Sequence, residues 1–194
     1  MSEKRLWTNH WLLYAVIVAL VISLLTFLYY RRDRPLTTVI LVRHAEKNIE
    51  PSNPNPNLSP AGHARAQELV RVLSGSGVTA IYATQYVRTQ QTVQPLATAM
   101  GLPVTQIDSG NTNELVRQVT TLHRGGIVFL AGHNNSVPAI IGALGGGNYP
   151  IIPDSDYDNM FVVTIDRLGK AKTIPLKYGS AMPATGNQQM IVKP

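Results

Sequence analysis

The chain contains no cysteine among its 194 residues, so it forms no disulfide bond, thiolate metal site or cysteine nucleophile. This excludes the cysteine-dependent phosphatases and proteases. Basic runs are also scarce: residues 1–36 carry +3 of the formal charge of +6, and the other 158 residues carry the remaining +3 without a Lys/Arg run. No basic stripe alternates with aromatic residues, so we expect no nucleic-acid partner.

A single long apolar run lies near the N-terminus. Trp11 to Tyr30 is twenty residues without a charge, which as a helix spans a hydrocarbon core of roughly 30 Å. Aromatic residues lie at both of its ends and arginines follow it, as at a membrane interface. A buried soluble helix and a cleaved signal peptide are the alternatives, but no small-residue cleavage site follows the run.

We therefore predict an N-terminal tail at 1–10, a transmembrane helix at 11–30 that contacts the lipid bilayer, a linker at 31–36 and one globular domain at 37–194. The protein would be a single-pass membrane protein. Three basic residues follow the run and two precede it, so the positive-inside rule favours a cytoplasmic domain by one charge and leaves the side open.

The globular part alternates strand and helix patterns, which predicts an α/β fold. A buried strand at 39–42 is followed by a Pro-rich loop at 48–57 and by a helix that starts with the cap Ser59 and Pro60. Pro95 predicts a kink or break in a later helix. The expected strands are 39–42, 78–83, 103–107, 126–131, 160–166 and 171–177, and the expected helices include 60–73, 113–122 and 136–144.

Two further groups of polar residues are not expected to form a catalytic or metal site. His63 and Arg65 lie on the polar side of the 60–73 helix, and we expect both on the surface. Asp154, Asp156 and Asp158 alternate as at the start of a calcium loop, but the glycine and glutamate that complete such a loop are missing. We expect no metal site there.

Basic residues follow three of the predicted strands. Arg43 and His44 end the first, Arg88 follows the second, and His133 follows the strand at 126–131. In a mostly parallel sheet these ends meet at one edge, where α/β proteins bind ligands. A guanidinium group can donate bidentate hydrogen bonds to two phosphate oxygens. A neutral imidazole is a nucleophile near pH 7. We expect His44 to attack phosphorus and His133 to donate to a phosphoryl oxygen.

Four stretches in this order, LVRHAEKN, LSPAGHARAQEL, ATQYVRTQQT and AGHNNS, resemble the histidine phosphatase superfamily, which includes phosphoglycerate mutases, sugar-phosphate phosphatases and phosphohistidine phosphatases. The resemblance implies a three-layer α/β/α sandwich with a mostly parallel central sheet. It also implies that His44 is phosphorylated, that Arg43 and Arg88 bind phosphate, and that His133 is the second catalytic histidine. Neither a metal nor a cofactor is implied, and the substrate would be a phosphorylated small molecule or phosphoprotein.

The sequence departs from the family pattern at two points. Ala45 stands where a glycine usually follows the first histidine, which is a small change. Asn134 stands where some members carry an aspartate that donates a proton. Other members place a glutamate between the second arginine and the second histidine, so Glu114 is the candidate for this role, with Asp108 and Glu46 as rivals.

We thus expect a metal-independent phosphatase that hydrolyses a phosphomonoester, or phosphohistidine, through a phosphohistidine intermediate on His44. A phosphoglycerate mutase-like phosphotransferase and an inactive, membrane-tethered module that binds a phosphorylated ligand are the alternatives. The segment from Arg88 to His133 is too short for a large cap domain, so we expect an open site.

Overall fold

The computed structural model describes residues 3–32 and 36–181 and divides into two units, Met1–Arg34 and Pro35–Pro194. In the first unit, helix α1 (Glu3–Arg32) is longer than the predicted span, because it includes residues that we expected in the tail and the linker. Its segment His10–Tyr30 is exposed, and it is long and apolar enough to cross a membrane. A signal sequence near an N-terminus meets the same criteria.

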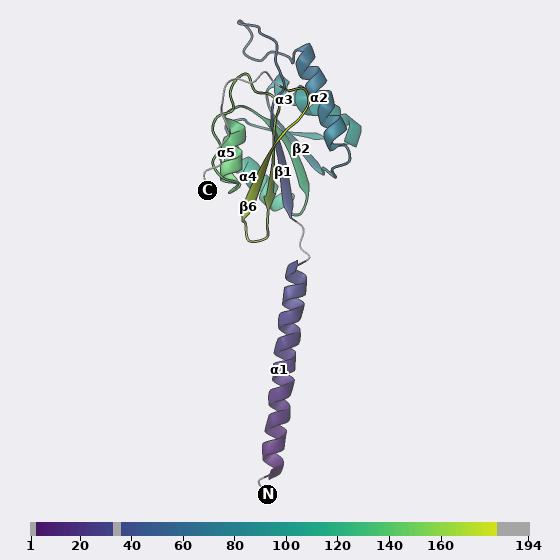
Figure 1. The fold of residues 1–194 in the computed structure, drawn as a ribbon, viewed down its shortest axis with the longest axis vertical. Helices are drawn as coiled ribbons and strands as arrows, with labels where there is room; N and C mark the ends of the chain where they lie inside the picture. Colours follow the sequence, from purple (N-terminus) through teal and green to yellow (C-terminus); the bar gives the residue numbers. More distant parts are fainter. Residues whose placement is uncertain (1–2, 33–35, 182–194) are drawn as a thin grey trace. The chain divides into compact units, whose positions relative to one another are not determined.

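The second unit is built around one mixed sheet of six strands in the order β3-β2-β4-β1-β5-β6 (Figure 1). Strands β1 to β4 run parallel to one another, and β5 is antiparallel to both β1 and β6. The predicted α/β fold with a mostly parallel sheet is therefore confirmed. The strands are β1 Thr37–Arg43, β2 Ala80–Thr84, β3 Val104–Ile107, β4 Ile127–Gly132, β5 Asn159–Ile165 and β6 Ala171–Lys177.

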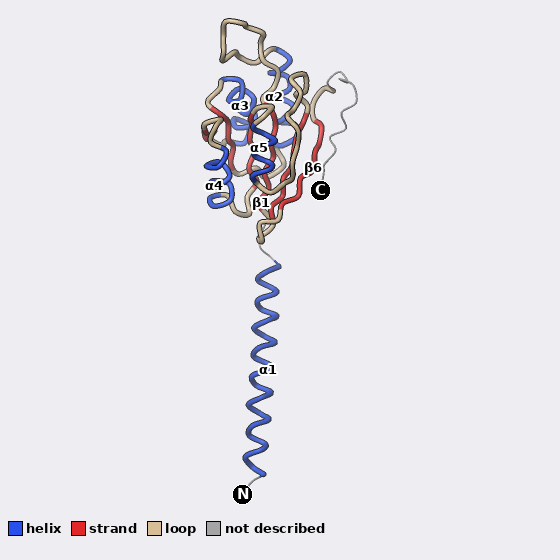
Figure 2. The backbone as a smooth tube through the Cα atoms, turned by 90° about the vertical axis from the view of Figure 1, so that its left-hand side faces the viewer, coloured by secondary structure: helices blue, strands red, loops and turns tan. Residues whose placement is uncertain are grey.

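Helices cover both faces of this sheet, as Figure 2 shows. Alternate side chains of β1 point to opposite faces: Ile40 and Val42 pack with one pair of helices, and Val39 and Leu41 with the other. The first pair is α2 (Pro60–Leu73) and α3 (Val87–Met100), and the second is α4 (Thr112–Leu122) and α5 (Ser136–Ala143). The three-layer α/β/α sandwich is thus confirmed.

Local signals explain most helix boundaries, with one correction. Ser59 caps α2 as predicted, since its hydroxyl accepts a hydrogen bond from the backbone N–H of Gly62. The break that Pro95 was predicted to cause, as an alternative to a kink, does not occur, because α3 continues through Pro95 to Met100. Pro95 removes a single helix hydrogen bond, while the buried side chains of Val93 and Leu96 on either side hold the helix to the sheet.

Four segments meet at the carboxyl edge of the sheet. The ladder between β1 and β4 continues past the strands, since His44 N–H donates to the carbonyl of Gly132 at 2.9 Å. The antiparallel pairing of Met160 with Val42 brings the loop before β5 to the same edge. The first turn of α3, which follows β2, completes the group.

Candidate active site

His44 and His133 lie side by side at this edge. Their ring centroids are 5.5 Å apart, and the two residues are only 4% and 8% exposed. His44 comes directly after β1 and His133 directly after β4, which are neighbouring parallel strands. The sheet topology therefore brings together two histidines that are 89 positions apart in the sequence.

The tautomer of His44 is set by its own loop. Its Nδ1 lies 2.8 Å from the carbonyl oxygen of Ala45, which only accepts, so Nδ1 carries the proton and Nε2 carries the lone pair. Ala45 N–H donates to Thr92 Oγ1 and fixes this turn to α3. Burial lowers the pKa of His44 to about 3, with help from the charges of Arg43 and Arg88. At pH 7 the ring is neutral, as a nucleophile requires.

His133 is oriented by a chain of two hydroxyl groups. Its Nε2 lies 2.9 Å from Thr84 Oγ1, which lies 2.8 Å from Thr89 Oγ1. Thr89 donates to backbone carbonyls, so Thr84 donates to Thr89 and accepts from His133 Nε2–H. We therefore assign the remaining ring nitrogen, Nδ1, as the one that can meet a ligand. Burial lowers the pKa of His133 to about 4, and the charges of Arg88 and Arg43 contribute.

Arg43 is held by the loop that precedes β5. Its Nη1 donates to the carbonyl oxygens of Pro153 and Asp156 at 2.7 and 3.2 Å, and its Nη2 meets Asp154 Oδ1 at 3.3 Å. The Asp154 side chain is exposed, so this ion pair is screened by water and weak. The positive charge of Arg43 is thus oriented mainly by neutral carbonyls.

Two half-buried tyrosines each contact one arginine and one histidine. The Arg88 guanidinium lies 4.3 Å from the ring centre of Tyr86, and that of Arg43 lies 4.2 Å from the ring centre of Tyr157. Tyr86 also meets the ring of His133 at 5.1 Å between centroids, and Tyr157 meets His44 at 6.0 Å. These contacts orient both cations without neutralising them.

Arg88 is short of hydrogen-bond acceptors. Its Nε and Nη1 are buried and have no partner among the described residues, and the same holds for Nε of Arg43. Burial lowers the pKa of Arg88, because the charged form is partly removed from water. Buried donors without partners are costly, so an anion that accepts from them would bind favourably.

An open pocket of about 370 Å³ borders Arg88 and His133. The rest of its lining is neutral, with no carboxylate, and is supplied by the residue before α3, the turn after β3 and the segment before α5. The lining residues are Tyr86, Arg88, Ser109, Gly110, His133, Asn134 and Asn135. A cationic, water-accessible pocket with polar neutral walls suits a phosphoryl group.

The expected proton donor Glu114 is not suited to that role. Its carboxylate accepts hydrogen bonds from Arg117 and Gln118 on its own helix, and the bonds from Arg117 above all hold its pKa at about 2. Both carboxylate oxygens of Glu114 are thus engaged on its own helix, the lowered pKa makes its protonated form rarer, and Glu114 does not line the pocket that borders Arg88 and His133. We therefore withdraw Glu114 as the candidate.

The Glu46 carboxylate is also bound, in this case by Arg65, which we had expected on the surface. Arg65 is buried instead of lying on the surface: its Nε and Nη2 donate to the Glu46 carboxylate at 2.8–3.0 Å. Arg65 also donates to the carbonyls of Tyr178 and Ser180, beyond β6. A side chain on Gly62 would overlap the carbonyl of Glu46, so α2 is packed closely against the loop after His44.

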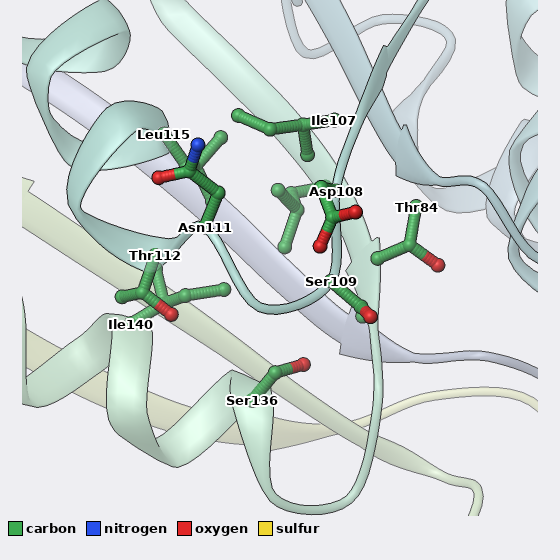
Figure 3. Close-up of a pocket in the computed structure, with 11 residues that line it drawn as sticks. Thr84, Ile107, Asp108, Ser109, Asn111, Thr112, Leu115, Ser136 and Ile140 are labelled. Atoms are coloured by element: carbon green, nitrogen blue, oxygen red, sulfur yellow. The ribbon is translucent and has the colours of Figure 1, made fainter.

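Asp108 is the remaining rival, and it makes no ion pair among the described residues. It lies in the turn after β3 with Ser109, close to Thr84, around a second pocket of only about 10 Å³ (Figure 3). Its Oδ1 accepts from the N–H of Gly110 at 2.8 Å. The next two residues in the sequence, Ser109 and Gly110, line the larger pocket that borders Arg88 and His133. Of the three candidate carboxylates, Asp108 is therefore the one whose sequence neighbours line that pocket.

Known proteins share the fold of this chain and part of its sequence pattern. A family model described as the histidine phosphatase superfamily (branch 1) matches residues 39–109, which include Arg43, His44 and Arg88. Three similar solved structures are the protein histidine phosphatase SixA complexed with tungstate, the Shigella flexneri alpha-ribazole phosphatase and a mycobacterial glucosyl-3-phosphoglycerate phosphatase. Their TM-scores are 0.62, 0.58 and 0.58, at identities of 16%, 14% and 12%.

The alignments cover 72%, 72% and 75% of this chain and 96%, 96% and 100% of those proteins, in the same order. At these identities they establish the fold. The family model and the structures together support the histidine phosphatase superfamily. A comparison with curated protein sequences found no match.

The sequence motifs predicted four of the residues that the structure brings together here, and the structure adds others. Tyr86, Thr84 and Tyr157 were not identified from the sequence, because aromatic and hydroxyl residues near a strand end are common and carry no specific pattern. Asp154 was considered only as part of a calcium loop. The antiparallel pairing of β5 with β1 would have indicated it, since the residues before β5 must lie where β1 ends.

No group of three or more potential metal ligands occurs among the described residues. Asp158, which we considered together with Asp154 and Asp156, is nearly buried and pairs with Lys177 at 2.6 Å. The acidic residues before β5 therefore bind Arg43 and Lys177 of β6.

Proposed function

We propose that this protein is a metal-independent phosphatase that works through a phosphohistidine intermediate on His44. The observation that carries the proposal is the contact between two buried, neutral histidines, whose ring centroids are 5.5 Å apart, beside two arginines. Neither arginine pairs with a buried carboxylate among the described residues. A dianionic phosphoryl group is the ligand that such a constellation suits best.

In the first step, His44 Nε2 forms a bond to phosphorus while the bond from phosphorus to the leaving group breaks. Arg43 and Arg88 bind the oxygens over which charge spreads. The dianion favours protonation of His133, which then donates from Nδ1 to a phosphoryl oxygen. In the second step, water attacks phosphorus, the bond to His44 breaks, and inorganic phosphate leaves.

The leaving oxygen of a phosphomonoester needs a proton, and Asp108 is our candidate donor. It would act in the first step as the acid and in the second as the base that activates water. Asp108→Asn should slow turnover of alkyl phosphates, which leave poorly without a proton, far more than that of aryl phosphates. Equal losses on both substrates would exclude this role.

Phosphohistidine is a second candidate substrate, favoured by the neutral lining of the pocket. Imidazole is a better leaving group than an alkoxide, so a site with no carboxylate on its wall can cleave the phosphorus–nitrogen bond. One of the structures with a similar fold is that of a protein histidine phosphatase. Phosphorylated small molecules are the other candidate class of substrate.

We propose in addition that His10–Tyr30 is an uncleaved, single-pass membrane anchor for the domain at 37–194, with the domain on the cytoplasmic side. Protease treatment of intact and of opened cells tests this. Cleavage of the domain in intact cells would place it outside, and a mature chain without residues 1–30 would identify a signal sequence.

The proposed activity is tested with the purified full-length chain and a generic aryl phosphate. His44→Ala should lower the rate by several orders of magnitude, whereas His63→Ala, a change of an exposed histidine on α2, should leave it unaltered. A chelator should have no effect. Activity that survives His44→Ala would refute the mechanism.

The two alternatives give different results in the same experiment. A mutase would need a bisphosphorylated primer and would retain the phosphoryl group. An inactive binding module would bind inorganic phosphate, as seen by a rise in melting temperature, without turning over any phosphate ester.

A further inference from the structure

The chain enters the domain at the end of the sheet opposite the active site. β1 begins at Thr37, and α1 ends at Arg32. Five residue steps cover at most about 18 Å, so the end of α1 and the start of β1 are closely tethered. β1 has seven residues, which makes it about 20 Å long, and His44 lies beyond its other end.

Two turns lie beside the start of β1. The N–H of Gly125, in the turn before β4, donates to Thr37 Oγ1 at 2.9 Å. Thr37 pairs with Ile165, the last residue of β5, so the turn 166–170 between β5 and β6 lies at the same end. Figure 1 shows this hairpin turn at the end of the sheet where β1 begins.

Exposed leucines gather on these segments. Leu36 precedes β1 and is 54% exposed, Leu122 ends α4 and is 67% exposed, and Leu168 at the hairpin turn is 66% exposed. A single exposed leucine needs no explanation, but three at one end of a domain suggest an interaction surface.

Basic side chains accompany these leucines. Arg124 follows Leu122, and Lys170 follows Leu168 by two residues; both are exposed. The acidic residue of the same hairpin, Asp166, is half-buried, and its Oδ1 accepts hydrogen bonds from the N–H groups of Leu168 and Lys170 in its own turn. Leucines beside outward-facing cations are typical of surfaces that lie on anionic lipid.

We infer that this end of the domain, the basal face formed by Leu36, Leu122, Arg124, Leu168 and Lys170, docks onto an anionic lipid bilayer. The inference rests on the proposed membrane anchor and is independent of the proposed chemistry. The short tether keeps the basal face near the lipid headgroups, the leucines enter the interface, and the cations meet lipid phosphates. The active site then opens away from the bilayer, so its substrate is dissolved in water.

Because the chain has no cysteine, single-cysteine labelling tests the docking on the full-length protein. Leu168→Cys, labelled with an environment-sensitive dye, is reconstituted in vesicles of phosphatidylcholine with 30% phosphatidylglycerol and in vesicles of phosphatidylcholine alone, roughly the anionic range over which polybasic surfaces respond. Ile49→Cys, in the loop after His44 and 95% exposed, is the matched control at the other end of the sheet. Leu20→Cys reports insertion of the anchor.

With anionic lipid, we expect lipid-borne quenchers to quench the dye at 168 and at 20 but not at 49. Adding Arg124→Glu and Lys170→Glu should lower quenching at 168 about fivefold or more, since each cation contributes to lipid attraction. Lys47→Glu with Arg117→Glu makes the same change in net charge elsewhere and should have no effect. Dye at 168 that stays as water-exposed as dye at 49, or dye at 20 that is not quenched, would overturn the inference.

Discussion

The guanidinium of Arg88 lies 4.3 Å from the centre of the Tyr86 ring and pairs with no carboxylate among the described residues. A carboxylate would orient the arginine equally well, but it would also cancel the charge that a phosphoryl group needs. An aromatic ring orients the cation and leaves its N–H donors for a ligand.

Replacing Tyr86 with Leu should therefore weaken phosphate binding. We expect the KM for an aryl phosphate and the inhibition constant of inorganic phosphate to rise about tenfold, as a cation–π contact of 1–2 kcal/mol implies. Tyr86→Phe keeps the ring and should retain nearly normal values. Tyr86→Glu orients Arg88 by a salt bridge and should bind phosphate more poorly than the Leu variant; tighter binding would contradict this account.

The enzyme should keep its kcat/KM at lower pH than an enzyme whose histidine nucleophile has an ordinary pKa. Burial lowers the pKa of His44 to about 3 and that of His133 to about 4. A lowered pKa means that the neutral nucleophile persists as the pH falls through 6.5. Once the rate is corrected for the second ionisation of the phosphate ester, near pH 6, kcat/KM should not fall between pH 6.5 and about pH 4.5.

An inflection near pH 6.5 that remains after this correction would show that a solvated histidine limits the rate. The measurement needs a buffer series of constant ionic strength, because both arginines attract the substrate electrostatically.

Arg65 should matter for stability more than its position on a helix suggests. Arg65→Met leaves the Glu46 carboxylate and two backbone carbonyls without their donors, so we expect the free energy of unfolding to fall by about 3 kcal/mol. The double variant Arg65→Met with Glu46→Gln should recover part of this loss, as measured by denaturant unfolding. Arg71→Met, on the exposed side of the same helix, is the control and should change little.

Most of the fold could be predicted from the sequence because the strands of the sheet are short apolar runs between clear turn signals. Arg43, His44, Arg88 and His133 could be proposed together because each lies at the end of a strand or shortly after it, and parallel strands end at one edge. Glu114 was misjudged since spacing along the chain does not show that Arg117 and Gln118 bind its carboxylate.

Arg65 was misjudged for a similar reason. Its position relative to Ala61 and Ala64 placed it on the polar side of α2, yet both alanines are exposed and Arg65 is buried. A buried arginine needs a carboxylate and carbonyls from distant segments, and these are supplied by Glu46 and by the chain beyond β6. Such partners are visible only once the fold brings them together.

The most direct test of the central claim is detection of the phosphoryl group on the enzyme. The full-length protein is mixed with an aryl phosphate, quenched in alkali within a single turnover, digested and analysed by mass spectrometry. We predict one acid-labile phosphate on His44, absent from His44→Ala. An enzyme that turns over substrate while phosphate appears on His133, on another residue, or nowhere at any quench time would contradict the account.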